Sequence, residues 1–372
     1  MPSCYLITGG AGFLGSYVAD ALLAAGHRVR ALDSLSPQVH GEARQVPAYL
    51  DPEVELVHGD VRDPDQVRRA LQGCDAVVHF AAAVGVGQSM YRMAEYTSIN
   101  NLGTAVLAEA LAENPVERLV VASSMSIYGE GLYRTLDGST RIVGERTPAQ
   151  LRRGQWDWTD EDGRPLVPIA TPEDKPPALA SVYALSKFDQ EKLCLMIGRA
   201  YRIPTVALRF FNAYGPRQAL SNPYTGVLAI FASRLLNDNR PLIFEDGDQM
   251  RDFVSARDIA QACVLALQAP DIDGEVFNVG SGEALSVREI AARMARILGK
   301  ERLQPEITGK YRVGDIRHCF ADLNRIKKAL GYQPKVTLEA GLEELAQWLS
   351  GQQASDRVIQ ASAELSSRGL TV

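Results

Sequence analysis

Short apolar runs alternate with helical patterns through the first 210 residues of the chain. The runs are rich in β-branched side chains and apolar almost throughout, as is typical of strands covered on both faces of a sheet. The longer segments between them have the periodicity of helices. We expect strands at 4–8, 28–32, 54–58, 76–80, 119–123 and 205–209, and helices at 13–25, 95–113 and 181–201.

This alternation predicts an α/β fold with a Rossmann-like, doubly wound parallel sheet. After residue 211 the alternation weakens, which predicts a smaller mixed α/β lobe. Helices are expected there at 227–236, 256–268 and 287–298. The expected domains are a dinucleotide-binding domain over 1–211, to which 251–285 returns, a lobe mainly over 212–350, and a mobile tail over 351–372. That tail is polar and has no convincing apolar face.

Composition and charge argue against several classes of function. The 372 residues are 46% apolar, and a net charge of −6 provides no basic field for nucleic acid or an anionic membrane. No uncharged apolar run reaches roughly 18 residues, and the N-terminus lacks the features of a secretion signal, so we expect a cytoplasmic protein. Five separated cysteines without a CxxC pair, and scattered histidines, argue against disulfides and a metal site.

A glycine-rich turn, Thr8-Gly9-Gly10-Ala11-Gly12-Phe13-Leu14-Gly15, joins the first expected strand to the first expected helix. Glycines let the backbone approach a pyrophosphate, which then rests on the helix N-terminus. The alternative is a tight turn without a ligand. We expect a dinucleotide here, with contacts from Gly9, Gly12, Phe13, Leu14 and Gly15.

Two acidic positions refine the cofactor prediction. Asp33 ends the second strand, where it can accept hydrogen bonds from the adenosine ribose and would repel a 2′-phosphate. Because no Arg or Lys lies in 34–38, NAD is favoured over NADP. Asp60, followed by Val61, closes the third strand, and we expect it at the adenine amino group. The alternative for Asp60 is a helix cap before Pro64.

Candidate reactive groups lie on the third helix and after the fifth strand. Tyr183 and Lys187 are four residues apart, which places the phenol and the ammonium on one face of a helix. That spacing also occurs by chance. Ser123-Ser124-Met125-Ser126 ends the fifth strand, at the edge where doubly wound sheets bind ligands.

Together these motifs resemble the extended short-chain dehydrogenase/reductase family, in its NAD-dependent nucleotide-sugar epimerase branch. The resemblance runs from Ser3 to about Trp348 and includes further ordered motifs: His79-Phe80-Ala81-Ala82, Asn100-Asn101-Leu102-Gly103-Thr104, Arg209-Phe210-Phe211-Asn212, Arg251-Asp252-Phe253-Val254 and Gly314-Asp315. It implies a nucleotide-diphosphate sugar as substrate and cofactor contacts from Ala81 and Asn100. It also implies a homodimer in which the helices that begin near Glu95 and Ser181 form a four-helix bundle.

The resemblance assigns a role to each reactive residue. Tyr183 would be the base, Ser124 would hold the reacting oxygen, and Lys187 would bind the nicotinamide ribose. A phenol with a pKa near 10 needs a downward shift of roughly 3 units to work near pH 7, which Lys187 and the positive nicotinamide can supply. Proton removal from the C4 hydroxyl, with hydride transfer to NAD, gives a 4-keto sugar, and hydride return to its other face inverts C4.

Two departures from the family pattern matter. Related dehydratases and decarboxylases carry acidic residues after the catalytic Ser or Thr, whereas this chain has Met125 and Ser126, which argues against dehydration. Ser126 is a candidate substrate contact. The segment before Tyr183 is unusually long, and its excess, 132–175, is rich in charge, Pro and Gly. For this insert we favour a solvated surface loop, with a substrate lid as the alternative.

The resemblance also places substrate contacts in the second half of the chain. Asn212, Arg251 and Arg312 match positions that contact the diphosphate, and an arginine fork suits phosphate oxygens. For Arg251 the alternative is an ion pair with Asp252 or Asp258. Further candidates, each of which could equally be a core residue, are Tyr224 and Phe244 beside the base and Cys319 in the sugar pocket.

Three hypotheses for function stay open. C4 epimerisation is favoured, with the strongest resemblance to bacterial dTDP-L-rhamnose 4-epimerases, ahead of UDP-glucose and UDP-glucuronate 4-epimerases. The second is a nucleotide-sugar dehydrogenase or reductase that exchanges NAD with solvent. The third is a non-catalytic nucleotide-sensing scaffold, against which the presence of Ser124, Tyr183 and Lys187 argues.

Overall fold

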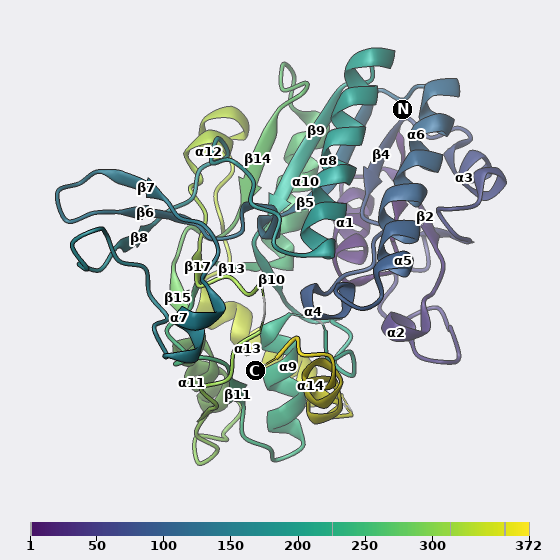
Figure 1. The fold of residues 1–372 in the computed structure, drawn as a ribbon. Coiled ribbons are helices and arrows are strands. Elements are labelled where there is room, and N and C mark those ends of the chain that lie inside the picture. The colour runs from purple at the N-terminus through teal and green to yellow at the C-terminus, as the bar shows by residue number, and fades with distance from the viewer. Residues whose placement is uncertain (1, 225, 313, 353–354, 372) are drawn as a thin grey trace.

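A parallel sheet forms the centre of the computed structural model, which describes residues 2–224, 226–312, 314–352 and 355–371. Its seven strands run in the order β14-β9-β5-β4-β1-β2-β3 (Figure 1). They are β1 (Cys4–Thr8), β2 (Arg28–Asp33), β3 (Glu55–His58), β4 (Ala76–His79), β5 (Arg118–Ser124), β9 (Thr205–Phe210) and β14 (Val276–Val279). All six strands predicted from the sequence are present, and the predicted fold class is confirmed.

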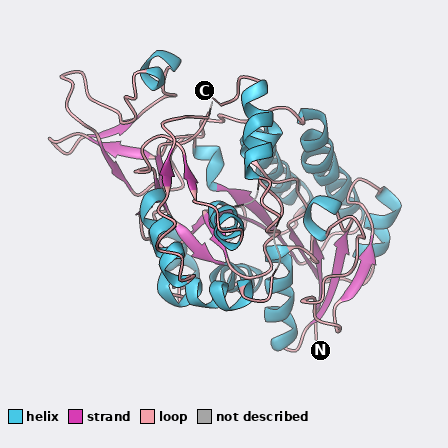
Figure 2. Cartoon of the chain, turned by 90° about the horizontal axis from the view of Figure 1, so that it is seen from below, coloured by secondary structure: helices cyan, strands magenta, loops and turns pink. Residues whose placement is uncertain are grey.

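Helices cover both faces of this sheet (Figure 2). On one face α1 (Phe13–Ala24) packs against α10 (Ala256–Gln268); on the other lie α3 (Pro64–Leu71), α6 (Gly103–Glu113) and α8 (Val182–Tyr201). The strands therefore bury alternate residues in two cores, Tyr5 and Ile7 in one and Leu6 in the other. Such two-sided burial explains why the sequence runs are apolar without alternation.

The helix predicted at 95–113 is interrupted by a π-helical segment. It consists of α5 (Met93–Tyr96), the π-helix η1 (Thr97–Leu102) and α6. A π turn widens the helix locally and is frequent at functional sites. Here it carries Asn100, one of the residues expected at the cofactor.

A smaller mixed lobe follows the sheet. Its core is formed mainly by α9 (Val227–Leu236), α11 (Val287–Ile297) and α13 (Leu338–Leu349). Short strands form three small separate sheets: β10 (Asn212–Tyr214) pairs with β13 (Phe253–Ser255), β11 (Leu242–Ile243) with β16 (Glu306–Ile307), and β12 (Met250–Arg251) with β15 (Leu285–Ser286) and β17 (His318–Cys319). From 251–285, α10 and β14 join the large domain. The boundary at residue 211 stays a prediction.

The insert over 132–175 is folded, in place of the expected solvated loop. It forms a three-stranded antiparallel sheet of β6 (Leu132–Arg134), β7 (Thr140–Ile142) and β8 (Val167–Ile169). The short helix α7 (Pro148–Arg152) lies between β7 and β8 in the sequence. Figure 1 shows this sheet projecting from the left of the molecule. At its base Arg146 Nη2 lies 2.8 Å from Glu245 Oε1, and Asp157 Oδ1 lies 2.8 Å from Arg317 Nε. Both pairs join the insert to the lobe.

The C-terminal segment (residues 355–371) is partly helical and has an apolar face, so the expectation of a tail without one was wrong, while its mobility stays a prediction. It contains α14 (Val358–Ser367), which buries Ala361 and Leu365. Asp356 Oδ2 forms a buried ion pair with Arg234 Nη1 on α9 at 3.1 Å.

The remaining helices are α2 (Pro37–His40), α4 (Val86–Ser89), α12 (Asn324–Leu330) and the 3-10 helix η2 (Met125–Tyr128). Within the described ranges, no helix combines the length and the apolar character needed to cross a membrane.

Candidate active site

The glycine-rich turn between β1 and α1 is too closely packed for side chains. A Cβ on Gly15 would lie 2.3 Å from the Gly9 carbonyl oxygen, and one on Gly10 would lie 2.6 Å from the Ala31 Cβ. Gly9 has a φ of +72°, which favours glycine. The N-cap of α1 is Gly12, so no capping side chain occupies the first-turn N–H groups, which include those of Phe13 and Leu14. Donors left in this way suit a diphosphate, and the turn fits the NAD prediction.

Asp33 lies directly beside this turn. Its Oδ2 accepts a hydrogen bond from Ala11 N at 3.0 Å, and its Oδ1 accepts one from Leu35 N at 2.9 Å. A carboxylate has about four acceptor positions, so ribose hydroxyls can still bind. His40 Nε2 lies 3.7 Å from Asp33 Oδ1. Because burial lowers the pKa of His40, that neighbour is neutral near pH 7 and offers no cation to a 2′-phosphate.

Asp60 does not cap the helix that follows it. The N-cap of α3 is Asp63, whose side chain accepts from two backbone N–H groups. The Asp60 carboxylate instead accepts two hydrogen bonds from the Arg62 guanidinium, one of them from Arg62 Nε to Asp60 Oδ1 at 2.9 Å. Val61 packs against Gly103, where a Cβ would lie 2.5 Å from Val61 Cγ1. The capping alternative for Asp60 was therefore wrong, while its role at adenine stays a prediction.

The loop after β4 is held in place by Asn100. The buried Asn100 amide bonds to both the N (2.7 Å) and the O (3.1 Å) of Ala83, and its Nδ2 also donates to Ser186 Oγ at 2.8 Å. Ala81, in the same loop, donates from its N to Thr8 Oγ1 at 3.2 Å. These contacts join the loop to the glycine turn, to η1 and to α8.

Ser124 and Tyr183 meet where β5 ends. Ser124 Oγ accepts hydrogen bonds from Ser126 Oγ at 2.9 Å and from Ser126 N at 3.2 Å. With both acceptor positions filled, the Ser124 hydroxyl is oriented to donate. Tyr183, near the start of α8 after the N-cap Ser181, lies close enough to Ser124 for that hydroxyl to lower the pKa of its phenol. The structure thus brings together the hydroxyl and the phenol that the sequence placed 59 residues apart.

The two candidate reactive groups of α8, Tyr183 and Lys187, are strongly affected by burial. Burial raises the pKa of the Tyr183 phenol, although the Ser124 hydroxyl opposes the shift. Burial also lowers the pKa of Lys187 to about 8, so its ammonium is the main form at neutral pH. A phenolate base near pH 7 therefore depends on positive charge close to the ring, as Lys187 and an oxidised nicotinamide would provide.

Arg251 and Arg312, both expected at the diphosphate, converge on Asp315. Arg312 donates from Nη2 to Asp315 Oδ2 at 2.9 Å, and Arg251 Nη2 lies 3.9 Å from Asp315 Oδ1. Although burial opposes it, these two charges hold the pKa of Asp315 below its usual range. The Arg312 guanidinium also lies 4.9 Å from the centre of the Phe244 ring. The alternative partners of Arg251, Asp252 and Asp258, instead accept from backbone N–H groups, so that alternative was wrong.

The other substrate candidates differ in their surroundings. Asn212 Oδ1 is buried and has no hydrogen-bond partner in the described part of the chain, so it can accept from a ligand. Tyr224 is half-buried, and its OH lies 2.6 Å from Tyr91 OH. Cys319 is 1% exposed and lies 3.8 Å from Thr171 Oγ1, so burial as a small hydrophobe describes it well.

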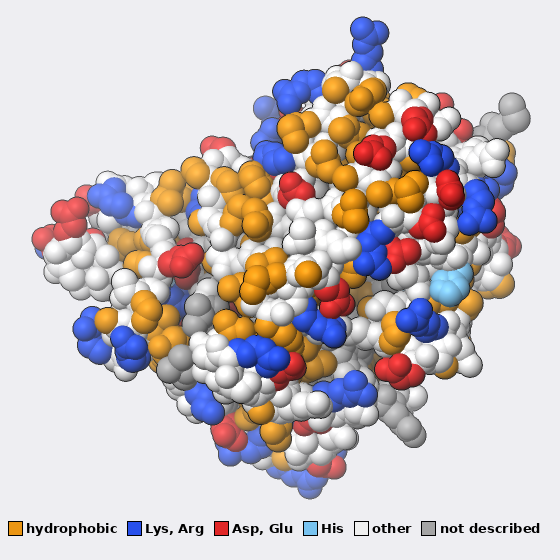
Figure 3. Space-filling model, turned by 45° about the vertical axis from the view of Figure 1, so that its right-hand side comes forward, with side chains coloured by type: hydrophobic (Ala, Val, Ile, Leu, Met, Phe, Trp, Pro, Cys, Tyr) orange, Lys and Arg blue, Asp and Glu red, His pale blue; other side chains and the backbone are white. Residues whose placement is uncertain are grey.

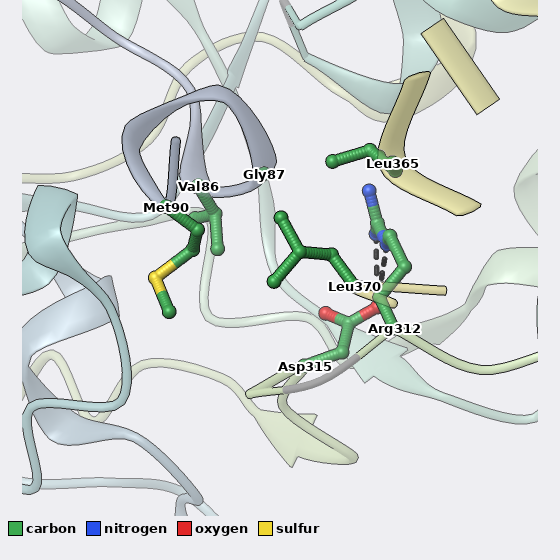
Figure 4. A pocket seen from close by; sticks show the side chains of 7 residues that line it. All are labelled: Val86, Gly87, Met90, Arg312, Asp315, Leu365 and Leu370. Carbon is green, nitrogen blue, oxygen red and sulfur yellow. Dashed lines mark hydrogen bonds and ion pairs between the residues drawn. The ribbon is translucent and has the colours of Figure 1, made fainter. Parts of the chain in front are cut away.

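A small cavity of about 10 Å³ lies between α4, Arg312 and the C-terminal segment. Figure 4 shows the Leu370 side chain between Val86 on α4 and Arg312, with Leu365 beside it. Thr371 also forms an antiparallel backbone bridge with Arg312. The sequence pattern gave no indication of this segment, because its few apolar residues are widely spaced. Nor did it indicate Tyr49, whose OH donates to the Ala11 carbonyl oxygen at 3.0 Å.

Metal ligation finds no support among the described residues, where no group of three His, Cys, Asp or Glu side chains is placed to hold an ion. The five cysteines are free thiols.

Comparison with known proteins agrees with this geometry. The model of the NAD dependent epimerase/dehydratase family matches residues 5–151 and 158–280. A dTDP-L-rhamnose 4-epimerase of Burkholderia thailandensis is 35% identical, over 93% of this chain and 94% of that protein. Among solved structures, UDP-glucose 4-epimerase of Thermotoga maritima with UDP-glucose has a TM-score of 0.76 at 28% identity, covering 93% and 98% of the two chains. UDP-glucose 4-epimerase of Thermus thermophilus with NAD has a TM-score of 0.73 at 30% identity, covering 94% and 99%.

Proposed function

Because this chain belongs to the NAD-dependent epimerase/dehydratase family, we propose that it inverts C4 of a nucleotide-diphosphate sugar through a transient 4-keto intermediate. The chain is an NAD-dependent enzyme of that family; the choice of epimerisation is the proposal. One observation carries it: the turn after β5 presents Met125 and Ser126, with no carboxylate among them. Loss of water from a sugar needs a second acid or base beyond the Tyr183 phenol.

Each residue has a defined part in this proposal. Bound NAD supplies the hydride acceptor and returns the hydride within the same turnover. Tyr183 takes the proton of the C4 hydroxyl and gives it back, while Ser124 donates a hydrogen bond to the reacting oxygen. Lys187 binds the nicotinamide ribose and stabilises the Tyr183 phenolate. Asn212, Arg251 and Arg312 hold the diphosphate.

We propose dTDP-L-rhamnose as the substrate and dTDP-6-deoxy-L-talose as the product. The 35% identical Burkholderia relative supports this choice. UDP-glucose and UDP-glucuronate are the alternatives, since relatives with comparable coverage act on them or bind them.

Isotopic labelling tests the reaction class separately from the substrate. With a substrate deuterated at C4, the C4 epimer should retain the label, because the hydride never becomes a solvent proton. In heavy water no deuterium should enter C3, C5 or C6, and NADH should not accumulate. Deuterium at C5 or C6 would indicate a dehydratase, stoichiometric NADH a dehydrogenase, and absence of turnover with all three sugars would refute the substrate choice.

We also propose a homodimer, formed in the cytoplasm, with α8 in its interface. Leu185 and Met196 are eleven residues apart, which is about three helical turns, so they share one face of α8. Both are half-exposed, as is Leu102 on η1, and Figure 3 shows apolar side chains gathered on the helical face that it brings forward. Light scattering of wild type and Leu185→Arg tests this, since only the variant should be monomeric.

A further inference from the structure

A buried hydrogen-bond network fixes the position of Lys187. Gln190 lies one turn after Lys187 on α8 and is 1% exposed. Its Oε1 accepts a hydrogen bond from Lys187 Nζ at 2.7 Å. Its Nε2 donates to Thr104 Oγ1 at 2.7 Å and to the Ala81 carbonyl oxygen at 3.3 Å. Because a carbonyl oxygen can only accept, the amide nitrogen must face Ala81, and the amide oxygen must face Lys187.

His79 on β4 completes the network on the side of the glycine-rich turn. Its Nδ1 lies 2.6 Å from Thr8 Oγ1, and its Nε2 lies 2.9 Å from Thr104 Oγ1. Burial and the charge of Lys187 lower the pKa of His79 to about 3, so the ring is neutral. The same Nε2 lies 3.2 Å from Gln190 Nε2, so the His79 ring belongs to the buried network that surrounds the Gln190 amide.

We propose that Gln190 is a positioning residue that aims the Lys187 ammonium and keeps it protonated. Lys187 is 3% exposed, and among the described residues Gln190 Oε1 is the one acceptor within hydrogen-bond distance of its Nζ. An ammonium has three donors, so this bond leaves two for cofactor hydroxyls. The proposal rests on the role of Lys187 in the proposed function, but not on the identity of the sugar.

The other ionisable groups around Lys187 do not replace Gln190. The Glu191 carboxylate is bound by Arg209 at 2.8 Å and by Ser123 at 2.7 Å. The Cys194 thiol is neutral, because burial raises its pKa to about 12. His79 is neutral, and the Tyr183 phenol lies beside Ser124. Within the described chain, the Gln190 amide oxygen is thus the one acceptor that hydrogen-bonds directly to the Lys187 ammonium.

The test measures NAD affinity against pH, which needs no sugar substrate. In wild type the affinity should fall as Lys187 loses its proton. Gln190→Met has similar volume but no amide oxygen, so the midpoint of that fall should move down by about one pH unit. Gln190→Glu keeps an oxygen and adds a negative charge, so the midpoint should move up. Leu195→Ala, which changes a packed apolar side chain further along the same helix, should leave it unchanged.

A purely structural role for Gln190 has a different signature. Both Gln190 variants lose the donor to Ala81, so both should lower Tm; opposite shifts of the pH midpoint distinguish positioning from packing. Shifts of the same sign, or lower Tm without any shift, would overturn the proposal. If Gln190→Met does not fold, the upward shift of Gln190→Glu relative to wild type decides the matter. The absorbance of the Tyr183 phenolate can be isolated by subtracting the spectrum of the Tyr183→Phe variant. In Gln190→Met this phenolate should form at higher pH than in wild type, because the neighbouring ammonium is less stable.

Discussion

The carboxylate of Glu364 on α14 lies 3.1 Å from the phenol oxygen of Tyr224, near the space that Arg312 borders. The same carboxylate oxygen lies 3.1 Å from Tyr91 OH, and Arg368 covers the Tyr91 ring at 4.5 Å. The C-terminal segment is therefore attached to one residue expected at the nucleotide base, Tyr224, and to one expected at the diphosphate, Arg312.

We expect removal of residues 358–372 to speed nucleotide binding. Leu370 stands between α4 and Arg312, so the segment has to move before a diphosphate reaches that arginine, and the closed population lowers the apparent affinity. A chain ending at Arg357 keeps the ion pair of Asp356 with Arg234. Stopped-flow fluorescence with dTDP or UDP should show association several-fold faster, and Leu370→Ser should show part of that gain. Slower or weaker binding would mean that the segment is a wall of the site instead.

Tyr183→Phe should lower turnover by about 10²- to 10⁴-fold, because only the ionisable oxygen is deleted. NAD and sugar affinities should stay within about twofold of wild type by calorimetry. Tyr96→Phe is the matched control: its ring lies edge-on to Tyr183, but its hydroxyl is bonded to Gln88. A Tyr183→Phe enzyme that keeps a tenth of wild-type activity would remove Tyr183 as the base.

NAD affinity should fall as pH rises through about 8. Burial lowers the pKa of Lys187 to about 8, so the ammonium is present below that pH and lost above it. Lys187→Ala should weaken NAD binding at pH 7 and remove this pH dependence, in fluorescence titrations from pH 6 to 10. Equal NAD affinity in wild type and Lys187→Ala at pH 7 would exclude the ribose contact.

Replacing Asp33 should relax discrimination against NADP. Asp33→Ser removes the negative charge beside the expected ribose, so the ratio of NADP to NAD dissociation constants should fall by about tenfold or more. NAD binding itself should weaken, since Asp33 also accepts from Ala11 N in the glycine turn. Asp33→Asn keeps the shape of the side chain and separates the two effects. A wild-type protein that binds both cofactors equally would contradict the assignment.

Local sequence patterns predicted the parts of this protein that local physics determines. The strands of the sheet are buried on both faces, so their apolar runs were visible, and the glycine turn was visible because close packing admits no Cβ. Tyr183 and Lys187 share a helix face, and their spacing alone indicated it. By contrast, α14 buries only a narrow stripe with Ala361 and Leu365, which no periodicity analysis would separate from a polar tail.

Long-range polar contacts could not be predicted in the same way. The contact of Gln190 with Ala81 and Thr104 crosses more than 80 residues of sequence, and nothing near Gln190 indicates its partner. Similarly, Asp315 binds both arginines expected at the diphosphate, whereas the alternatives considered for Arg251 were Asp252 and Asp258.

The folded insert has an implication for how related sequences vary. Arg146 and Asp157 belong to the insert, while their partners Glu245 and Arg317 belong to the lobe and are each 1% exposed. A relative that lacked the insert but kept both lobe residues would lose these two ion pairs, while Arg317 would keep Glu245 and Asp246 as partners. Residues 146, 157, 245 and 317 should therefore covary across the family, together with the presence of the insert.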